Sequence, residues 1–197
     1  MSNCQRFEVP RLELVGWHLV SAALRPILHT IVFTRSFGPT EPRELHEDGL
    51  GVSYGAVKDP ETEKYLAQKI QEFVLWLQRR PSHSGTLKLA FRDRPLKKSR
   101  SSFFLETGAC WEEWLISVKV FVHEVPVDVE TVTQSVKDSL EFIMRSVATN
   151  HYPLPSLGNM TLLESFSISV VTENKTYEFL HAVHRAVQDV STTSLLR

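Results

Sequence analysis

Ser53 lies in the pattern Gly51-Val-Ser53-Tyr-Gly55, which has the spacing of a hydrolase nucleophile elbow. Such a serine needs a hydrophobic strand before it and a helix directly after it, so that its hydroxyl stands at a strained turn. Here the preceding residues, His46 to Gly49, are mostly polar, and the next helix signal appears only at Asp59. We therefore interpret this segment as a glycine-flanked edge strand without a nucleophile.

Other patterns that carry chemistry are incomplete. Glu178, His181 and His184 are spaced by three residues on one predicted helix, but no fourth metal ligand or HExxH motif accompanies them. The adjacent carboxylates Glu112 and Glu113 lie on a predicted strand, so they point to opposite faces and cannot share acid–base work. No phosphate-binding glycine loop is present. We expect no enzymatic activity, no cofactor and no metal.

A basic segment at residues 92–100 is a candidate for binding phosphate groups. Five cations occur within nine positions, at Arg92, Arg94, Lys97, Lys98 and Arg100. They could contact phosphates of a nucleic acid or of lipid headgroups, or they could form a solvated loop between two strands. Phe103 and Phe104 follow, and they either tuck under the sheet or protrude as an apolar finger that needs a partner pocket.

Composition narrows the class of protein. The chain has 197 residues, 42% of them hydrophobic and 23% charged, which suits one globular domain. A formal net charge of -1 gives no global attraction to nucleic acid, so we expect no nucleic-acid partner. Cys4 and Cys110 are the only cysteines and form no CxxC motif, so we expect neither a disulfide framework nor a cysteine-based zinc site. Neither a signal peptide nor a membrane span is apparent, and we expect a cytoplasmic protein.

The hydrophobic periodicity predicts helices and strands in mixed order. A helix with Pro26 inside it, where proline should kink or divide it, spans about 16–37, and a loop follows at 38–51. Asp59 and Pro60 predict the start of a helix that ends near Arg80. Further strands are predicted at 86–92, 114–122 and 166–170, and helices at 128–150 and 176–190. This order favours an α+β fold, with a mainly antiparallel sheet and helices packed largely on one face.

Phe142 departs from the pattern of its helix. It lies more than about 100° around the helix from the apolar stripe of Val136, Leu140 and Ile143, on the side of Asp138 and Arg145. A phenylalanine on a polar face suggests that the face is covered. The cover is either another part of the same chain or a partner protein.

Several short motifs resemble one family. Residues 27–32 (ILHTIV), followed by Arg35-Ser36-Phe37-Gly38, are similar to the first-helix signature of autophagy-related protein 101. The same holds for Lys97-Lys98-Ser99-Arg100 with Phe103, and for Trp111-Glu112-Glu113-Trp114 leading into Val118-Lys119-Val120. The order and spacing of these motifs fit the family over most of the chain.

The resemblance implies a single HORMA domain over residues 1–197 with no catalytic site. It implies a scaffold subunit of the autophagy-initiation kinase complex that pairs with and stabilises the HORMA domain of autophagy-related protein 13, contacts other subunits, and works at the preautophagosomal structure. HORMA pairs typically meet through the helix predicted at 128–150, which makes Phe142, Arg145 and Asp138 partner-binding residues. The alternatives are a HORMA adaptor that captures a peptide by strand addition, and a module whose basic 92–100 segment contacts lipid, as a peripheral membrane contact, or nucleic acid.

The sequence departs from the family at one place. Animal members carry a protruding tryptophan–phenylalanine pair directly after the Lys-Ser-Arg stretch, and this pair is thought to recruit downstream factors. Here Ser101 and Ser102 occupy the first positions, and only Phe103 and Phe104 keep aromatic character. Any finger function would therefore rest on these two phenylalanines.

Overall fold

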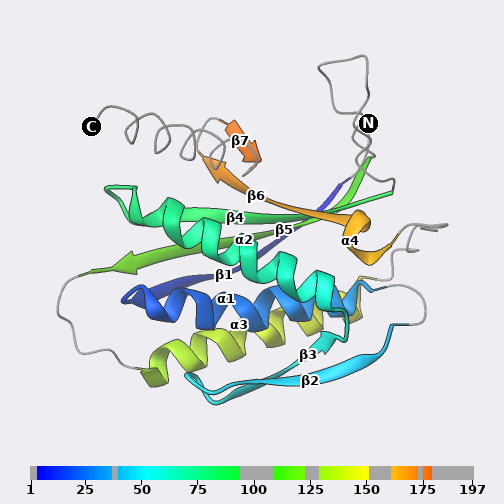
Figure 1. Ribbon diagram of the computed structural model, residues 1–197, viewed down its shortest axis with the longest axis horizontal. Coiled ribbons are helices and arrows are strands. Elements are labelled where there is room, and N and C mark those ends of the chain that lie inside the picture. The colour runs from blue at the N-terminus through cyan, green and yellow to red at the C-terminus, as the bar shows by residue number, and fades with distance from the viewer. Residues whose placement is uncertain are drawn as a thin grey trace, which may run out of the picture.

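The computed structural model describes residues 4–36, 40–93, 109–122, 129–150, 161–172 and 175–178. A five-stranded sheet has the order β1-β5-β4-β6-β7, and a separate two-stranded hairpin pairs β2 with β3 (Figure 1). The strands are β1 (Gln5–Val15), β2 (Pro42–Glu47), β3 (Val52–Val57), β4 (Ser84–Arg92), β5 (Cys110–Phe121), β6 (Phe166–Thr172) and β7 (Lys175–Glu178). The helices are α1 (His18–Thr34), α2 (Pro60–Gln78), α3 (Val129–Thr149) and the short α4 (Leu162–Ser165).

The sheet is mainly antiparallel. The pairs β4–β5, β4–β6 and β6–β7 are antiparallel, whereas β1 runs parallel to β5, with Gln5 opposite Glu112 and a register shift between Val9 and Leu12. The long helices α1, α2 and α3 cover one face of this sheet (Figure 1). These features confirm the predicted α+β class.

The core lies between that sheet face and the helices. Alternate strand residues, such as Trp114, Ile116 and Val118 of β5, are buried against the helices. Helix α1 is buried along most of its length because the sheet, α2, α3 and the β2–β3 hairpin surround it. It continues through Pro26, so of the two predicted effects of this proline, a kink or a division, the division does not occur.

The start of α2 confirms its sequence signal. Asp59 is the N-cap, and its carboxylate accepts a hydrogen bond from the Thr62 backbone N–H at 3.3 Å. Pro60 occupies the first turn, where a missing N–H costs nothing, and Glu61 and Glu63 face the positive end of the helix dipole.

Three segments differ from the sequence prediction. The loop predicted at 38–51 contains β2, because its charged residues form the exposed strand of a hairpin whose partner carries the buried side chains. No element was predicted before residue 16, yet β1 lies there; its Pro10 and its register shift interrupt the alternation. Residues 175–178 form β7 instead of the start of a helix, because a strand can pair there with β6. The rest of that predicted helix lies outside the described residues.

Cys4 and Cys110 form a disulfide in this structure, against the expectation of no disulfide framework. Their Cα atoms lie 5.4 Å apart although 106 positions separate them in the sequence. The parallel pairing of β1 with β5 brings the starts of the two strands together, and cysteine spacing alone cannot reveal such a contact.

Candidate functional site

Helix α3 is the element that the sequence singled out for partner binding. Its buried stripe consists of Val132, Val136, Ser139 and Ile143, and it packs against α1 and β1. The opposite side faces solvent. Thr133 also donates a hydrogen bond from its hydroxyl to the Leu50 carbonyl at 3.1 Å, which joins α3 to the turn of the β2–β3 hairpin.

Phe142 is partly buried against its own chain. Its ring meets the ring of Trp114 edge to face, with 6.5 Å between centroids, and it packs on the hydrophobic core. The apolar pattern placed it too far from the buried stripe, because that pattern includes the half-buried Leu140 and omits the buried Ser139. Ser139 is fully buried, with its hydroxyl donating to the Ser135 carbonyl at 2.8 Å, so the true stripe is shifted toward Phe142.

Asp138 and Arg145 lie on the exposed side of α3, as their positions in the sequence predicted. The Asp138 carboxylate accepts a hydrogen bond from Gln134 at 2.7 Å, and the Arg145 guanidinium lies 2.5 Å from the Glu141 carboxylate. Exposed pairs of this kind, one turn apart on a helix, contribute only a few tenths of a kcal/mol (~0.3–0.5). Both charged groups can therefore exchange these partners for others at little cost.

The exposed apolar side chains of α3 are Met144 and Val129, with 53% and 41% of their surfaces accessible. Leu140 and Val147 are only partly buried beside them. These four residues recur at helical spacing on the flank of α3 opposite to Phe142. The apolar stripe of α3 is therefore wider than the surface of the chain that covers it.

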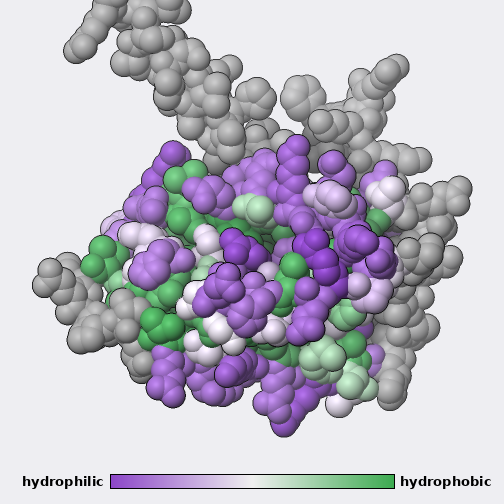
Figure 2. Space-filling view, turned by 60° about the horizontal axis from the view of Figure 1, so that its bottom comes forward, coloured by the Kyte–Doolittle hydropathy of each residue, from purple (hydrophilic) through white to green (hydrophobic). Residues whose placement is uncertain are grey.

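Figure 2 looks onto the side of the molecule that carries α3 and the hairpin. Hydrophilic side chains cover most of this view, and separate hydrophobic patches lie between them. We use the name α3 outer surface for Val129, Lys137, Asp138, Glu141, Met144 and Arg145. It combines apolar and charged side chains on a rigid element, as the core and rim of protein–protein interfaces do.

The basic segment is described only at its start. Arg92 is partly buried at the end of β4, where it stands opposite Cys110 of β5. Arg94, Lys97, Lys98 and Arg100 lie outside the described residues, as do Phe103 and Phe104. The phosphate-contact and finger interpretations therefore stay predictions.

Ser53 lies in β3, flanked by glycines, as its sequence context predicted. Its hydroxyl is 3.1 Å from Nδ1 of His46 on the paired strand, and Asp48 lies 3.8 Å from Nε2 of the same ring. Although these residue types resemble a catalytic triad, Ser53, His46 and Asp48 are all exposed on a regular hairpin. The backbone at Ser53 has no strained elbow to present the hydroxyl.

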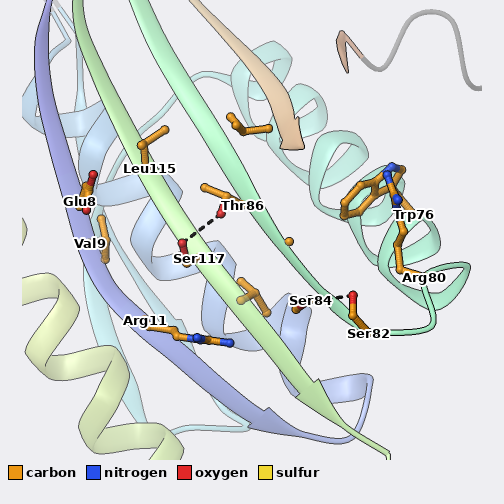
Figure 3. A pocket seen from close by; sticks show the side chains of 13 residues that line it. Glu8, Val9, Arg11, Trp76, Arg80, Ser82, Ser84, Thr86, Leu115 and Ser117 are labelled. Carbon is orange, nitrogen blue, oxygen red and sulfur yellow. Dashed lines mark hydrogen bonds between the residues drawn. The ribbon is translucent and has the colours of Figure 1, made fainter. Parts of the chain in front are cut away.

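A groove of about 1110 Å³ runs over the open face of the sheet and around the edge of β4. In Figure 3 the hydroxyls of Thr86 and Ser117 turn toward each other across β4 and β5, at 3.0 Å. Trp76 of α2 and Arg80, just beyond the end of that helix, border one end, and the described lining has neither histidine nor cysteine. The groove therefore offers hydrogen-bonding groups but no paired nucleophile and base.

Two of the motifs that carry the family resemblance meet in the core. The Arg35 guanidinium at the end of α1 holds the Glu112 carboxylate of β5 through two parallel contacts of 2.8 Å, and Trp114 donates its indole N–H to the same carboxylate at 2.6 Å. Arg35 and Glu112 are only 4% and 1% exposed. Glu113 lies on the other face with Arg6, which confirms that the two carboxylates diverge.

No helix within the described residues combines the length and the apolar character that a membrane crossing requires.

The structure defines an α+β domain with helices layered on one sheet face and an exposed helix surface. The family model for "Autophagy-related protein 101" matches residues 15–159, and the chain belongs to this family. It is also similar to "Autophagy-related protein 101" of Arabidopsis thaliana, with 29% identity over 119 residues. That match covers 60% of this chain and spans about half (54%) of the Arabidopsis protein.

Proposed function

We propose that this chain is a non-catalytic scaffold subunit of autophagy initiation that binds a second folded domain through the α3 outer surface. Membership of the family supports a role in autophagy. The resemblance identified from the sequence supplies the finer assignment: a HORMA domain, paired in the cytoplasm with the HORMA domain of autophagy-related protein 13 and assembled with other subunits at the preautophagosomal structure. The observation that carries the proposal is the exposure of Met144 and Val129 on a helix that is otherwise polar on this side.

The α3 outer surface has suitable chemistry for such a partner. A stable interface removes about 1,600 Å² from water in total, and a few anchors near its centre supply most of the energy. Met144 is unbranched and polarizable, so its side chain adapts to an irregular partner surface. Asp138 and Arg145 would form the charged rim, which sets orientation and association rate more than affinity.

Phe142 has a supporting role in this proposal. Its ring packs edge to face on Trp114 and so anchors the helix that presents the outer surface. The exposed part of the ring can still contact the partner at the margin. A charge at this position would damage the fold as well as the interface, which makes Phe142→Asp a poor test.

Met144→Asp is the better test, because the side chain is exposed and its loss leaves the core intact. The full chain is co-purified with the HORMA domain of autophagy-related protein 13 from the same organism, and the dissociation constant is measured by calorimetry. We expect binding to weaken at least about 30-fold, the size of a hot-spot loss of about 2 kcal/mol. The melting temperature of the isolated variant should match that of the wild type.

Leu75→Asp is the matched control. Leu75 of α2 is 44% exposed, against 53% for Met144, so the same charge is introduced at a similarly exposed apolar residue on a different helix. It should leave partner affinity unchanged. If Met144→Asp and the wild type bound the partner with equal affinity, the assignment of α3 as the interface would be overturned. If neither the wild type nor Met144→Asp bound it, the proposed partner itself would be overturned.

A further inference from the structure

We propose that Cys4 and Cys110 form a thiol oxidation site, at which a peroxide-class oxidant makes a reversible disulfide that fastens the start of β1 to the start of β5. The Cα atoms of the two residues lie 5.4 Å apart, a separation that a disulfide spans. Both residues are partly exposed, so oxidants and thiol reductants can reach them. The inference does not depend on the proposed partner.

The fold holds both strand starts together without the disulfide. The β1–β5 ladder begins at Gln5 and Glu112, and Phe7 stacks on Trp114 with 4.3 Å between ring centroids. Across the open face, Arg6 lies 2.5 Å from Glu113. The reduced protein therefore keeps the two thiols adjacent, which is the condition for a bond that can form and break repeatedly.

The charges around the thiols favour oxidation over metal binding. Glu113 places a carboxylate oxygen within 4.8 Å of both sulfurs, so these three groups also resemble an incomplete metal site. Arg6 and Lys88 already engage this carboxylate, at 2.5 and 3.9 Å, and their positive charges oppose a divalent cation. They also offset the negative charge that would otherwise disfavour a thiolate, and the thiolate is the form that peroxide oxidises.

The reaction balances without a metal or cofactor. One thiolate attacks a peroxide oxygen, the O–O bond breaks, and the products are a sulfenic acid and, after protonation, water. The second thiol then displaces water from the sulfenic sulfur and forms the S–S bond. Overall, two thiols and one hydrogen peroxide give one disulfide and two waters. A dithiol reductant restores both thiols through a mixed disulfide.

Because the chain has only these two cysteines, the test has one possible intramolecular product. The full chain is reduced with a dithiol, freed from it, and treated with graded hydrogen peroxide. We expect both free thiols to disappear together, with a loss of two hydrogen atoms in mass. A non-reducing tryptic digest should join residues 1–6 to residues 101–119, and a glutathione buffer of cytosolic ratio should reverse the change.

Three single variants test whether the two thiols react with each other and whether Arg6 affects the rate of that reaction. Cys4→Ser and Cys110→Ser should fold, and under peroxide they should gain oxygen at the remaining thiol. Arg6→Gln should slow disulfide formation about three- to ten-fold, because the Glu113 carboxylate loses part of its compensation beside the thiols. Cys110→Ser with Arg6 unchanged serves as the rate control for unpaired Cys4.

Three results would overturn the proposal. The thiols could oxidise independently or join two chains instead of one. The disulfide could resist reduction by glutathione, which would make it a permanent brace. Finally, the reduced protein could bind stoichiometric zinc from zinc chloride and thereby protect both thiols from maleimide, which would make Cys4, Cys110 and Glu113 a metal site.

Discussion

Two neighbouring carboxylates of β5 lie on opposite faces of the central sheet and have different surroundings. Glu112 points into the helix-covered face, where Arg35 and Trp114 occupy its carboxylate and water is excluded. Glu113, the next residue, points to the open face, where its partner Arg6 is largely exposed. A charge on the covered face depends on its partner, because removing one member leaves the other desolvated and unpaired. On the open face Glu113 is itself mostly covered, but the guanidinium of Arg6 remains in contact with water.

The largest effect is expected on the covered face. Arg35→Ala leaves the buried Glu112 carboxylate without its guanidinium and should lower the free energy of unfolding by about 3–5 kcal/mol. Urea denaturation followed by tryptophan fluorescence measures this loss. Arg35→Lys should recover only part of it, since an ammonium cannot make two parallel contacts. A loss below about 1 kcal/mol is the size expected for an exposed ion pair, and it would mean that burial does not make the Arg35–Glu112 pair more important for stability than a pair on the open face.

His29 should give an effect of similar size, and one that depends on pH. Burial, with smaller contributions from Arg25 and Arg43, lowers the pKa of His29 from 6.5 to about 4. The folded protein therefore keeps this ring neutral where the unfolded chain protonates it. The stability that His29 confers is complete above pH 6.5 and is lost as the pH falls toward 4, by about 3 kcal/mol in total.

The measurement compares unfolding free energies of wild type and His29→Gln between pH 7 and pH 4. The wild type should lose more stability than the variant over this range. His18→Gln, at an exposed histidine of the same helix, should follow the wild type. Parallel curves for all three proteins would contradict the assignment of His29 as a buried neutral group.

A third prediction compares the two flanks of α3. Phe142→Ala removes a ring that packs on Trp114 and should cost about 2–3 kcal/mol, below the full cost of a completely buried phenylalanine. Met144→Ala should change stability by no more than about 0.5 kcal/mol, because its side chain is exposed. Thermal unfolding measures both. Equal losses would show that the two flanks are equally covered by the chain itself.

The sequence predicted α2 and its Asp59 cap, the three central strands and the α+β class, because each has strong local signals. It also predicted the divergence of Glu112 and Glu113 from strand alternation alone. It could not predict β1, whose pairing with β5 depends on residues about a hundred positions away, and it missed the Cys4–Cys110 contact for the same reason. Local pattern contains no information about such partners.

On α3, periodicity predicted the helix itself but misjudged which of its apolar side chains is the most exposed. The side of a helix that is buried is inferred from the angular positions of its residues around the axis, and here only the apolar residues were counted. A fully buried serine shifts that angle, and Ser139 is such a residue because its hydroxyl bonds within the helix. The more exposed apolar side chain of the helix is therefore Met144, not Phe142.

The smallest effect should come from the open face and is best measured as a coupling energy. Arg6 and Glu113 form an ion pair in which the arginine side chain is 61% exposed, so solvent screens the attraction. A double-mutant cycle with Arg6→Gln and Glu113→Gln, under reducing conditions, should give less than about 1 kcal/mol at low salt. At about 1 M salt, where the screening length is roughly 3 Å, the coupling should fall further. The same cycle with Arg35 and Glu112 should keep most of its coupling at high salt, because ions cannot enter the buried face. If both cycles responded equally to salt, the difference between the two faces would have to come from packing instead of solvent access.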